Sequence, residues 1–164
     1  WCMFFRLSGR EFEHGAGEAN RKSLRALVCD RTPAPGLVAY LDGVPVGWCA
    51  VAPRADYPRV LRSPINRPAP DDDQADASVW AVTCFYVRRG QRRTGVAATL
   101  LAAAVDFAVE HGARIVEGYP NDAGGREAHP LSLFMGTPEL FKSAGFTEHL
   151  RRKPRRPVRR YQAG

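Results

Sequence analysis

"YVRRGQRRTGVAATLL", residues 86–101, joins the end of an apolar strand pattern to the start of an alanine-rich helix pattern. Four arginines lie at the junction: Arg88, Arg89, Arg92 and Arg93. The first N–H groups of a helix have no intrahelical partner, and they already give that end a partial positive charge. Adding cations there is unfavourable unless an anion lies between them. The stretch therefore predicts a bound phosphate or carboxylate where the helix begins.

The glycines of this junction do not match the common nucleotide loops. Gly90 and Gly95 have the spacing G-x-x-x-x-G, but Val96 and Ala97 stand where a P-loop needs Lys and Ser or Thr. The Rossmann pattern G-x-G-x-x-G is absent as well. A nucleoside triphosphatase and a dinucleotide-binding fold are both disfavoured. What remains is the pattern Arg92-x-x-Gly95-x-Ala97 between a strand and a helix.

The surrounding patterns alternate between helices and strands, and residues 78–87, 96–111 and 114–119 predict a strand–helix–strand unit with parallel strands. The other predicted elements are a helix over 18–30, a hairpin over 37–53 about Asp42-Gly43, a short helix between Thr137 and Gly145, and strands around 146–152 and 157–161. Residues 54–77 are rich in proline, contain the acidic run 71–73 and show no periodicity, which predicts a long mobile loop.

Length and composition favour one globular domain. The chain has 164 residues, of which 45% are apolar. It has no apolar run of about 18 residues or more and no cleavable leader pattern, so we expect no membrane span and a cytoplasmic location. The four cysteines are scattered, without a C-x-x-C pair or a histidine at ligand spacing. They are expected to be reduced, and no metal site is predicted.

The net charge of +7 comes from one segment near the end of the chain. Residues 151–160, "RRKPRRPVRR", hold seven basic residues and no acidic one, which leaves 17 basic and 17 acidic residues elsewhere. No aromatic platform for single-stranded nucleic acid is interleaved with the segment, so nucleic-acid binding is disfavoured. We expect two closing strands instead, with Val158 and Tyr161 packed inward and the arginines facing water.

The stretch Arg92–Ala97 resembles the acetyl-CoA-binding motif Q/R-x-x-G-x-G/A of the GCN5-related N-acetyltransferase (GNAT) family, and the order of predicted elements over residues 18–161 is similar as well. The resemblance implies an α/β fold over 1–164, with a mixed, mostly antiparallel sheet, a central parallel strand pair and flanking helices. The family's first strand and first helix have no counterpart in the sequence. We therefore expect a form that is truncated at the N-terminal end relative to the family.

The resemblance also implies how coenzyme A would be held. Backbone N–H groups and the helix N-terminus would bind its pyrophosphate, through Arg92, Arg93, Thr94, Gly95, Val96 and Ala97. Backbone groups of Phe85 and Val87 would meet the pantetheine arm and the thioester. Asn121 is similar to an asparagine that the family often has after the second parallel strand, although an asparagine there can equally be a turn former.

Transfer to an amine requires a proton acceptor, because a primary amine with a pKa of about 10 is protonated at neutral pH. Glu117 and Tyr119 are the candidate bases, and a structural role for either, or a water chain in their place, stays open. Phe141 stands four residues before Gly145, where the family often has a tyrosine that protonates the departing thiolate. Phenylalanine cannot donate a proton, so the thiol, with a pKa of about 8.5, would leave unaided or with other help.

Two functions follow from this resemblance. The first is an N-acetyltransferase that moves an acetyl group from acetyl-CoA to a small-molecule or protein amine by direct attack on the thioester, without a metal. The alternative is a non-catalytic acyl-CoA-binding or sensing module. The sequence does not identify the acceptor; the run Asp71–Asp73 can attract a cationic one or can simply be solvated. It also leaves a homodimer open.

Overall fold

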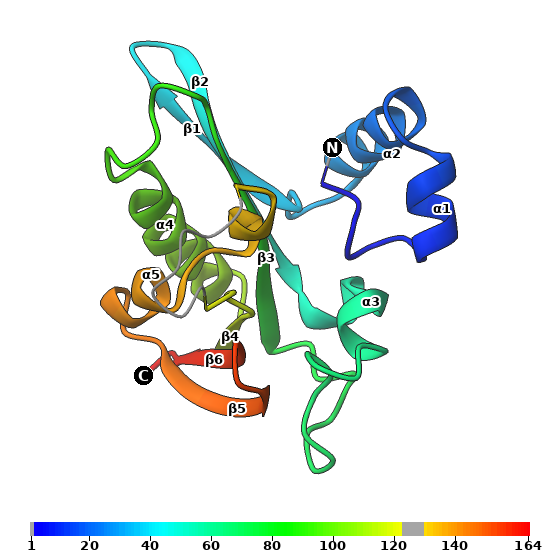
Figure 1. Cartoon of the computed structure of the whole chain (residues 1–164), viewed down its shortest axis with the longest axis vertical. Coiled ribbons are helices and arrows are strands. Elements are labelled where there is room, and N and C mark those ends of the chain that lie inside the picture. Colours follow the sequence, from blue (N-terminus) through cyan, green and yellow to red (C-terminus); the bar gives the residue numbers. More distant parts are fainter. Residues whose placement is uncertain (1, 123–129) are drawn as a thin grey trace.

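The structure is a computed structural model that describes residues 2–122 and 130–164 (Figure 1). Six strands form one sheet: β1 Gly36–Leu41, β2 Val44–Pro53, β3 Val79–Val87, β4 Ile115–Gly118, β5 Thr147–Lys153 and β6 Arg156–Gln162. The helices are α1 Gly9–His14, α2 Glu18–Asp30, α3 Pro58–Leu61, α4 Val96–Glu110 and α5 Pro138–Ser143, with short 3-10 helices η1 Arg54–Asp56 and η2 Pro130–Met135.

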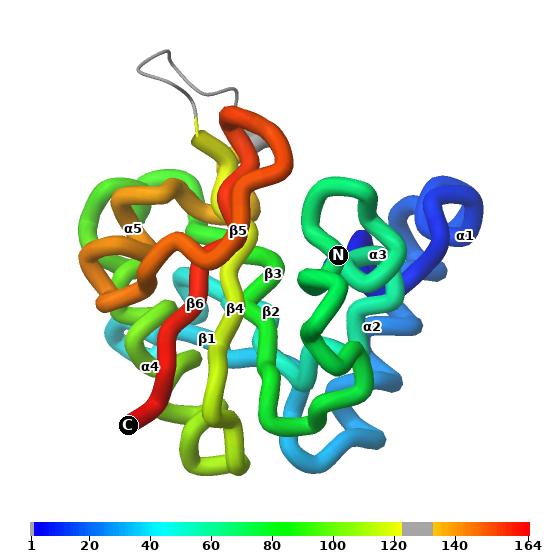
Figure 2. Tube along the Cα trace, turned by 90° about the horizontal axis from the view of Figure 1, so that it is seen from below, coloured from blue at the N-terminus to red at the C-terminus, as the bar shows by residue number. Residues whose placement is uncertain are grey.

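The strand order in the sheet is β1-β2-β3-β4-β6-β5. Strands β3 and β4 are parallel, and the other neighbouring pairs are antiparallel. Helices α4 and α5 cover one face of the sheet and α1, α2 and α3 lie on the other, as Figure 2 shows. This arrangement confirms the predicted fold class, a mixed and mostly antiparallel sheet with a central parallel pair and flanking helices.

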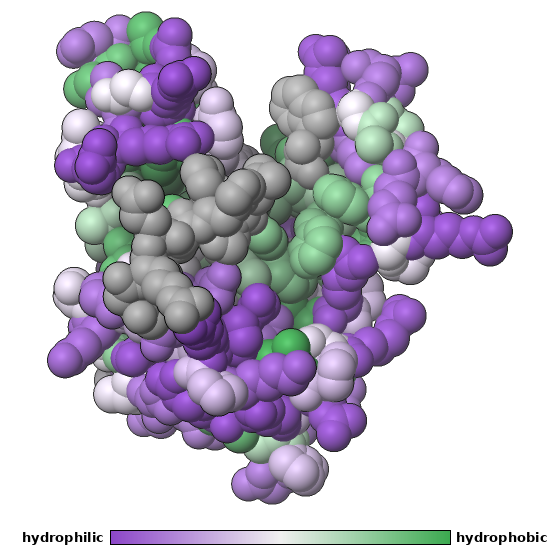
Figure 3. Space-filling model, viewed as in Figure 1, coloured by the Kyte–Doolittle hydropathy of each residue, from purple (hydrophilic) through white to green (hydrophobic). Residues whose placement is uncertain are grey.

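The predicted hairpin forms at its expected turn. Asp42 and Gly43 both have positive φ, 50° and 75°. Two such residues in a two-residue connection match the right-handed twist of the flanking strands. The hairpin makes β1 an edge strand, and it projects beyond the body of the sheet (Figure 1). On the face seen in Figure 3, apolar residues line the hollow between this hairpin and the N-terminal helices.

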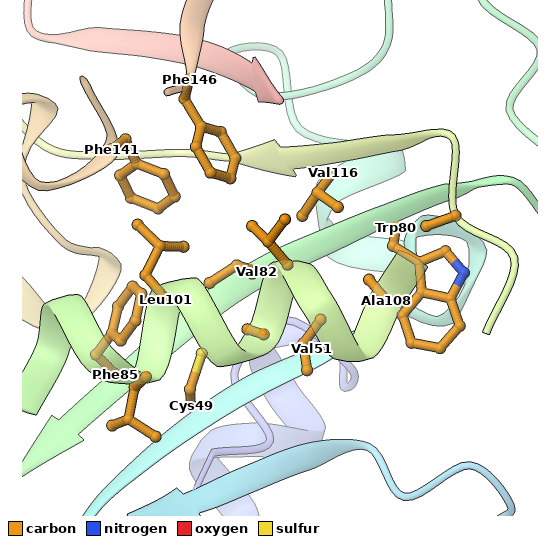
Figure 4. Packing of buried hydrophobic residues seen from close by; sticks show 14 residues of the cluster. Cys49, Val51, Trp80, Val82, Phe85, Leu101, Ala108, Val116, Phe141 and Phe146 are labelled. Atoms are coloured by element: carbon orange, nitrogen blue, oxygen red, sulfur yellow. The ribbon is translucent and has the colours of Figure 1, made fainter. Parts of the chain in front are cut away.

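Helix α4 packs its apolar stripe against the sheet. Leu101, Ala104 and Ala108 are completely buried in a cluster that includes Val82 of β3 and Val116 of β4 (Figure 4). The start of the helix is held close to β2 at Gly47. A Cβ atom at Gly47 would lie only 2.8 Å from Val96 Cγ1, so a larger residue there would push α4 outward. The position of the α4 N-terminus is therefore fixed by close packing.

Strands β3 and β4 separate halfway along β3. Their pairing ends at Val82 and Gly118, whereas β3 continues to Val87. At the same point the pairing of β2 with β3 skips Thr83, which forms a β-bulge. A bulge bends its strand and increases its twist, and bulges often lie beside functional sites. The last part of β3 therefore has β2 on one edge and a gap toward β4 on the other.

The N-terminal part of the chain differs from the expectation. Helix α1 was not predicted, although its capping box was readable: Ser8 accepts a hydrogen bond from the Glu11 backbone, and the Glu11 side chain accepts one from the Ser8 backbone. The described residues contain no strand before β1.

Residues 54–77 are not a plain loop, and that prediction was wrong. They contain η1 and α3, and two arginines from outside the segment, Arg152 and Arg160, tie them to the body of the protein. Arg152 of β5 donates to the carbonyl oxygens of Ile65, Arg67 and Pro68. Arg54 donates to the Asp73 carbonyl, and Arg160 pairs with Asp72. Backbone carbonyls of this irregular segment thus accept hydrogen bonds from guanidinium groups. Such contacts cannot be predicted from the periodicity of the sequence.

The basic C-terminal segment forms strands β5 and β6, as predicted. Val158 packs inward, at 2% exposure. The expectation that its arginines face water was wrong for Arg160, which is 8% exposed. Because side chains alternate along a strand, Arg160 lies on the same face as Val158. Strand β6 also lies between β4 and β5, so the segment supplies an inner strand of the sheet.

Candidate functional site

The loop between β3 and α4 is shaped by three residues in the left-handed region: Gly90, Arg93 and Gly95, with φ of 95°, 65° and 90°. Thr94 Oγ1 donates to the Gln91 carbonyl at 2.7 Å and steadies the loop. Gly95 is the N-cap of α4, and no side chain caps this helix end. A Cβ atom at Gly95 would meet nothing within 4 Å, so the surface before the helix is open. The arrangement suits an anion bound by backbone N–H groups.

The arginines of the loop surround this end of α4. Arg88, Arg89, Arg92 and Arg93 are all exposed. Arg92 Nε donates to the Val87 carbonyl at 3.3 Å. The structure thus brings together Arg92 and Val87, two residues that the sequence placed in one binding site. Their contact joins the loop before α4 to the free end of β3.

Backbone groups of Phe85 and Val87 face the gap beside β4. The Arg88 N–H donates to the Val46 carbonyl of β2 at 2.8 Å. Because backbone direction alternates along a strand, the N–H and C=O groups of Phe85 and Val87 point the other way, toward β4. Beyond Val82, β3 and β4 are not paired. The Phe85 groups and the Val87 N–H are therefore available to an extended ligand that runs along the strand, whereas the Val87 carbonyl accepts from Arg92.

The segment after η2 borders this gap. The Asn121 N–H donates to the Gly136 carbonyl at 3.1 Å, so the predicted asparagine contacts this segment through its backbone. A Cβ at Gly136 would lie 3.3 Å from the Phe85 ring and 2.9 Å from that of Phe141. Gly136 also has a φ of 80°, which favours glycine. The mouth of the gap is thus formed by Phe85, Gly136 and Asn121.

Phe141 fills the space beneath the gap. Its side chain is fully buried, and its ring packs edge-on against Phe85 and Phe146 (Figure 4). A Cβ on Gly118 would lie 2.1 Å from this ring, so the glycine is required for the ring to lie against β4. The residue that stands in place of the family's tyrosine is therefore a core residue next to the end of the β3–β4 pairing, with no proton to donate.

The two candidate bases contact each other on the opposite side of β4. Tyr119 Oη donates to Glu117 Oε2 at 2.6 Å, and both side chains are buried. Burial raises the pKa of Tyr119 well above its ordinary value, and the charge of Glu117 adds to this. Tyr119 packs in the cluster on the face away from α4, whereas Phe85 and Phe141 belong to the α4 cluster. Tyr119 therefore keeps its proton at neutral pH.

The Glu117 carboxylate is engaged by two guanidinium groups that the sequence analysis missed. Its Oε1 atom accepts from Arg54 Nη1 at 2.9 Å and from Arg160 Nη2 at 2.7 Å. Arg160 also pairs with Asp72, which lies 3.5 Å from His149 Nε2. Partial burial alone would raise the pKa of Asp72, but the hydrogen bond and charge of Arg160 lower it below its ordinary value. The alternation of Val158 and Arg160 along β6 was the available signal for this network.

Within residues 2–122 and 130–164, no cluster of His, Cys, Asp or Glu could hold a metal ion, and no helix is long and apolar enough to cross a membrane. Cys2, Cys29, Cys49 and Cys84 form no disulfide among the described residues.

The site thus combines a left-handed loop, an uncapped helix N-terminus and a strand edge that opens at a bulge. The profile described as the "Acetyltransferase (GNAT) family" matches residues 1–128. The chain belongs to the GNAT acetyltransferase family. The enzymes of this family are acetyltransferases that use acetyl-CoA as their co-substrate.

Solved GNAT structures share the fold at low sequence identity. A ribosomal-protein-alanine N-acetyltransferase from Brucella melitensis aligns with a TM-score of 0.56 and 18% identity, over 90% of this chain and 80% of that one. The putative acetyltransferase yncA from Salmonella typhimurium, solved with its cofactor acetyl-CoA, aligns with a TM-score of 0.54 and 14% identity, over 89% of this chain and 74% of that one. The paia N-acetyltransferase from Thermoplasma acidophilum, in complex with coenzyme A, aligns with a TM-score of 0.54 and 12% identity, over 99% of this chain and 84% of that one. No curated protein matches the chain.

Proposed function

We propose that the protein transfers the acetyl group of acetyl-CoA to the nitrogen of an amine by direct attack. The observation that carries this proposal is the contact between Arg92 and Val87, because it joins an open helix N-terminus to the free edge of β3. One continuous surface can then hold a pyrophosphate at α4 and an extended thioester arm along Phe85 and Val87. Such a surface suits coenzyme A better than an isolated phosphate.

The residues present fit the coenzyme. The pyrophosphate would be bound by backbone N–H groups over residues 92–97, with Gly95 leaving open space where a side chain would stand. The arginines would add charge at the rim of the site. The N–H and C=O groups of Phe85 and the N–H of Val87 would pair with the amide-bearing arm, as a neighbouring strand would. Asn121 would border the arm through its contact with Gly136.

The reaction needs a route for the protons of the amine. The protonated amine first gives up one proton; its nitrogen then forms a bond to the thioester carbon, the carbon–sulfur bond breaks, and the nitrogen loses a second proton as the thiolate leaves. Glu117 is held by Arg54 and Arg160, and Tyr119 is protonated, so neither is free to accept a proton without breaking buried contacts. We propose that Glu117 fixes β4 beside the gap and that solvent accepts the protons. Because Phe141 has no proton to donate, the thiolate would depart without a proton donor at this position.

A non-catalytic acyl-CoA-binding module is the second candidate. The buried Phe141 and the engaged Glu117 favour it, because both positions lack the groups that would move protons. Binding of acyl-CoA would then occur at the same surface without turnover. The two candidates differ in what happens to the thioester when an amine is present.

A time course of free-thiol release from acetyl-CoA, with a panel of amines, tests the proposal. The predicted result is release that depends on both the amine and the protein, with the N-acetylated amine identified by mass spectrometry. Release at the spontaneous rate with every amine, from protein that binds coenzyme A, would support the binding module and overturn catalysis. The Gly95→Asp variant serves as the control for release that does not pass through the coenzyme site.

A further inference from the structure

Arg156, at the start of β6, has a guanidinium group without an anionic partner in the described residues. Its Nη2 atom lies 3.4 Å from the sulfur of Met135, and its Nε atom is buried without a hydrogen-bond partner. A thioether is a weak acceptor, whereas a guanidinium offers five N–H donors. A cation that is partly removed from water normally gains a carboxylate or phosphate in exchange. Partial burial lowers the pKa of Arg156 below its ordinary value.

The other buried or partly buried arginines of this face differ from Arg156. Arg54 and Arg160 share the Glu117 carboxylate, and Arg6 pairs with Asp56. Each is accounted for by a carboxylate of the chain. Arg59 and Arg152 have no carboxylate partner, but they donate to backbone carbonyl oxygens. Arg156 therefore stands out as the partly buried guanidinium whose contact in the described residues is a thioether.

Arg156 lies next to the segment that borders the β3–β4 gap. The Met135 side chain that it contacts belongs to the residue before Gly136, and Gly136 lies against the Phe85 ring. Met135 and Val158 both pack in the cluster on the face away from α4. The coenzyme phosphates would lie at the N-terminus of α4, on the other face. An anion at Arg156 would thus belong to a molecule that approaches the gap from the acceptor side.

The charges of this face also argue against a polycationic acceptor. The sequence left open an attraction of cations by Asp71–Asp73, but the Asp72 carboxylate pairs with Arg160. Glu117 is engaged as well. Met135, which Arg156 contacts, and Val158, on the same face of β6, are apolar and buried.

We infer that Arg156 binds an anionic group of the acetyl acceptor, so that the acceptor is a small amine that also carries a carboxylate or a group of similar charge and shape. This inference rests on the proposed acetyl transfer to an amine. A guanidinium matches a carboxylate with two parallel hydrogen bonds, which would fix the amine end of such a molecule relative to the gap. Arg156 is thus a specificity-determining residue.

The test compares Arg156→Gln with the matched control Arg155→Gln, since Arg155 is exposed in the adjacent turn. Acceptors are used in pairs that differ only in charge, such as leucine and leucinamide. Wild type and Arg155→Gln are expected to favour leucine in kcat/KM. Arg156→Gln should lose about tenfold or more with leucine, mainly through KM, and little with leucinamide. Arg156→Lys should restore part of the loss.

A second readout does not depend on turnover. Calorimetry with the products N-acetylleucine and N-acetylleucinamide, in the presence of coenzyme A, should show tighter binding of the carboxylate by wild type and no such preference in Arg156→Gln. Equal binding of the two products by wild type, or an equal loss of both in a variant with an unchanged melting temperature and coenzyme A affinity, would overturn the inference. Absence of any acetylated amine would instead count against the proposed function, and the product preference would still decide the role of Arg156.

Discussion

The Oε1 atom of Glu117 lies 2.7 Å from Nη2 of Arg160, in a cross-strand pair that joins β4 to β6. The same oxygen accepts from Arg54, which comes from the end of β2 through η1. One carboxylate therefore connects three parts of the chain that are distant in sequence. It lies on β4 directly before Gly118, where β4 separates from β3.

Replacing Glu117 with Gln should destabilise the fold because it leaves two guanidinium groups without their shared anion. Removing one partner of a buried ion pair costs about 3 kcal/mol or more. Chemical denaturation of Glu117→Gln should show a loss of that order. Glu139→Gln, on the exposed face of α5, is the matched control and should change stability little. A stable Glu117→Gln variant without activity would contradict the structural role and point back to Glu117 as a base.

Asp72 should make the stability depend on acid pH. Its pKa is lowered in the folded state, so its contribution is present above its unfolded pKa of about 3.9 and is lost as the pH falls through the lower folded value. Asp72→Asn should therefore be less stable than wild type at pH 7, and the difference should shrink below about pH 4. Melting temperatures across this range measure the effect. Asp71→Asn, next to it and exposed, should show no such convergence, and a constant gap for Asp72→Asn would refute the assignment.

Gly118 and Phe141 should be strongly coupled. A Cβ at Gly118 would lie 2.1 Å from the Phe141 ring, so Gly118→Ala should destabilise by about 3 kcal/mol. Phe141→Ala creates a cavity and should cost a similar amount or more. The double variant should be more stable than the sum of the two losses predicts, because the cavity accepts the methyl group. A second double-mutant cycle, of Gly118→Ala with Phe146→Ala, serves as the control, because the Phe146 ring is not the one nearest to Gly118. Its two losses of unfolding free energy should be closer to additive. Additive losses in both cycles would contradict the contact between Gly118 and Phe141.

Arg92→Ala should weaken coenzyme A binding only modestly. The side chain is exposed, so its charge contribution is about 1 kcal/mol, or about fivefold in affinity. Backbone N–H groups of the loop would carry most of the contact. Calorimetry with coenzyme A at low and high salt measures both affinity and screening. A thousandfold loss would show that the guanidinium dominates.

Local patterns were sufficient for most of the fold. The hairpin about Asp42-Gly43, the strand before the glycine loop and the helix from Val96 all appear where periodicity and turn chemistry placed them. These elements depend on neighbours in sequence. The loop from Arg92 to Ala97 was readable for the same reason, because its glycine and its position before a helix are local signals.

The contacts that the sequence did not reveal are long-range. Arg54 and Arg160 are 106 positions apart, yet both engage Glu117. From the sequence alone, the basic run 151–160 is expected to be solvated. Only the sheet order shows that β6 is an inner strand and that Arg160 faces the buried side. The segment 54–77 shows no hydrophobic periodicity, and its backbone is held by side chains from elsewhere in the chain, such as Arg152. Predicting these contacts requires the sheet topology first.

The central claim is that the N-terminus of α4 binds the pyrophosphate of coenzyme A, and Gly95→Asp tests it most directly. Gly112→Asp is the matched control, since Gly112 follows the other end of α4 with a φ of 89° and equally open surroundings. Titration calorimetry with coenzyme A should show binding by wild type and by Gly112→Asp, and none by a folded Gly95→Asp, because its carboxylate would repel the phosphates. Equal affinity in the two variants, or no binding by wild type, would contradict the account.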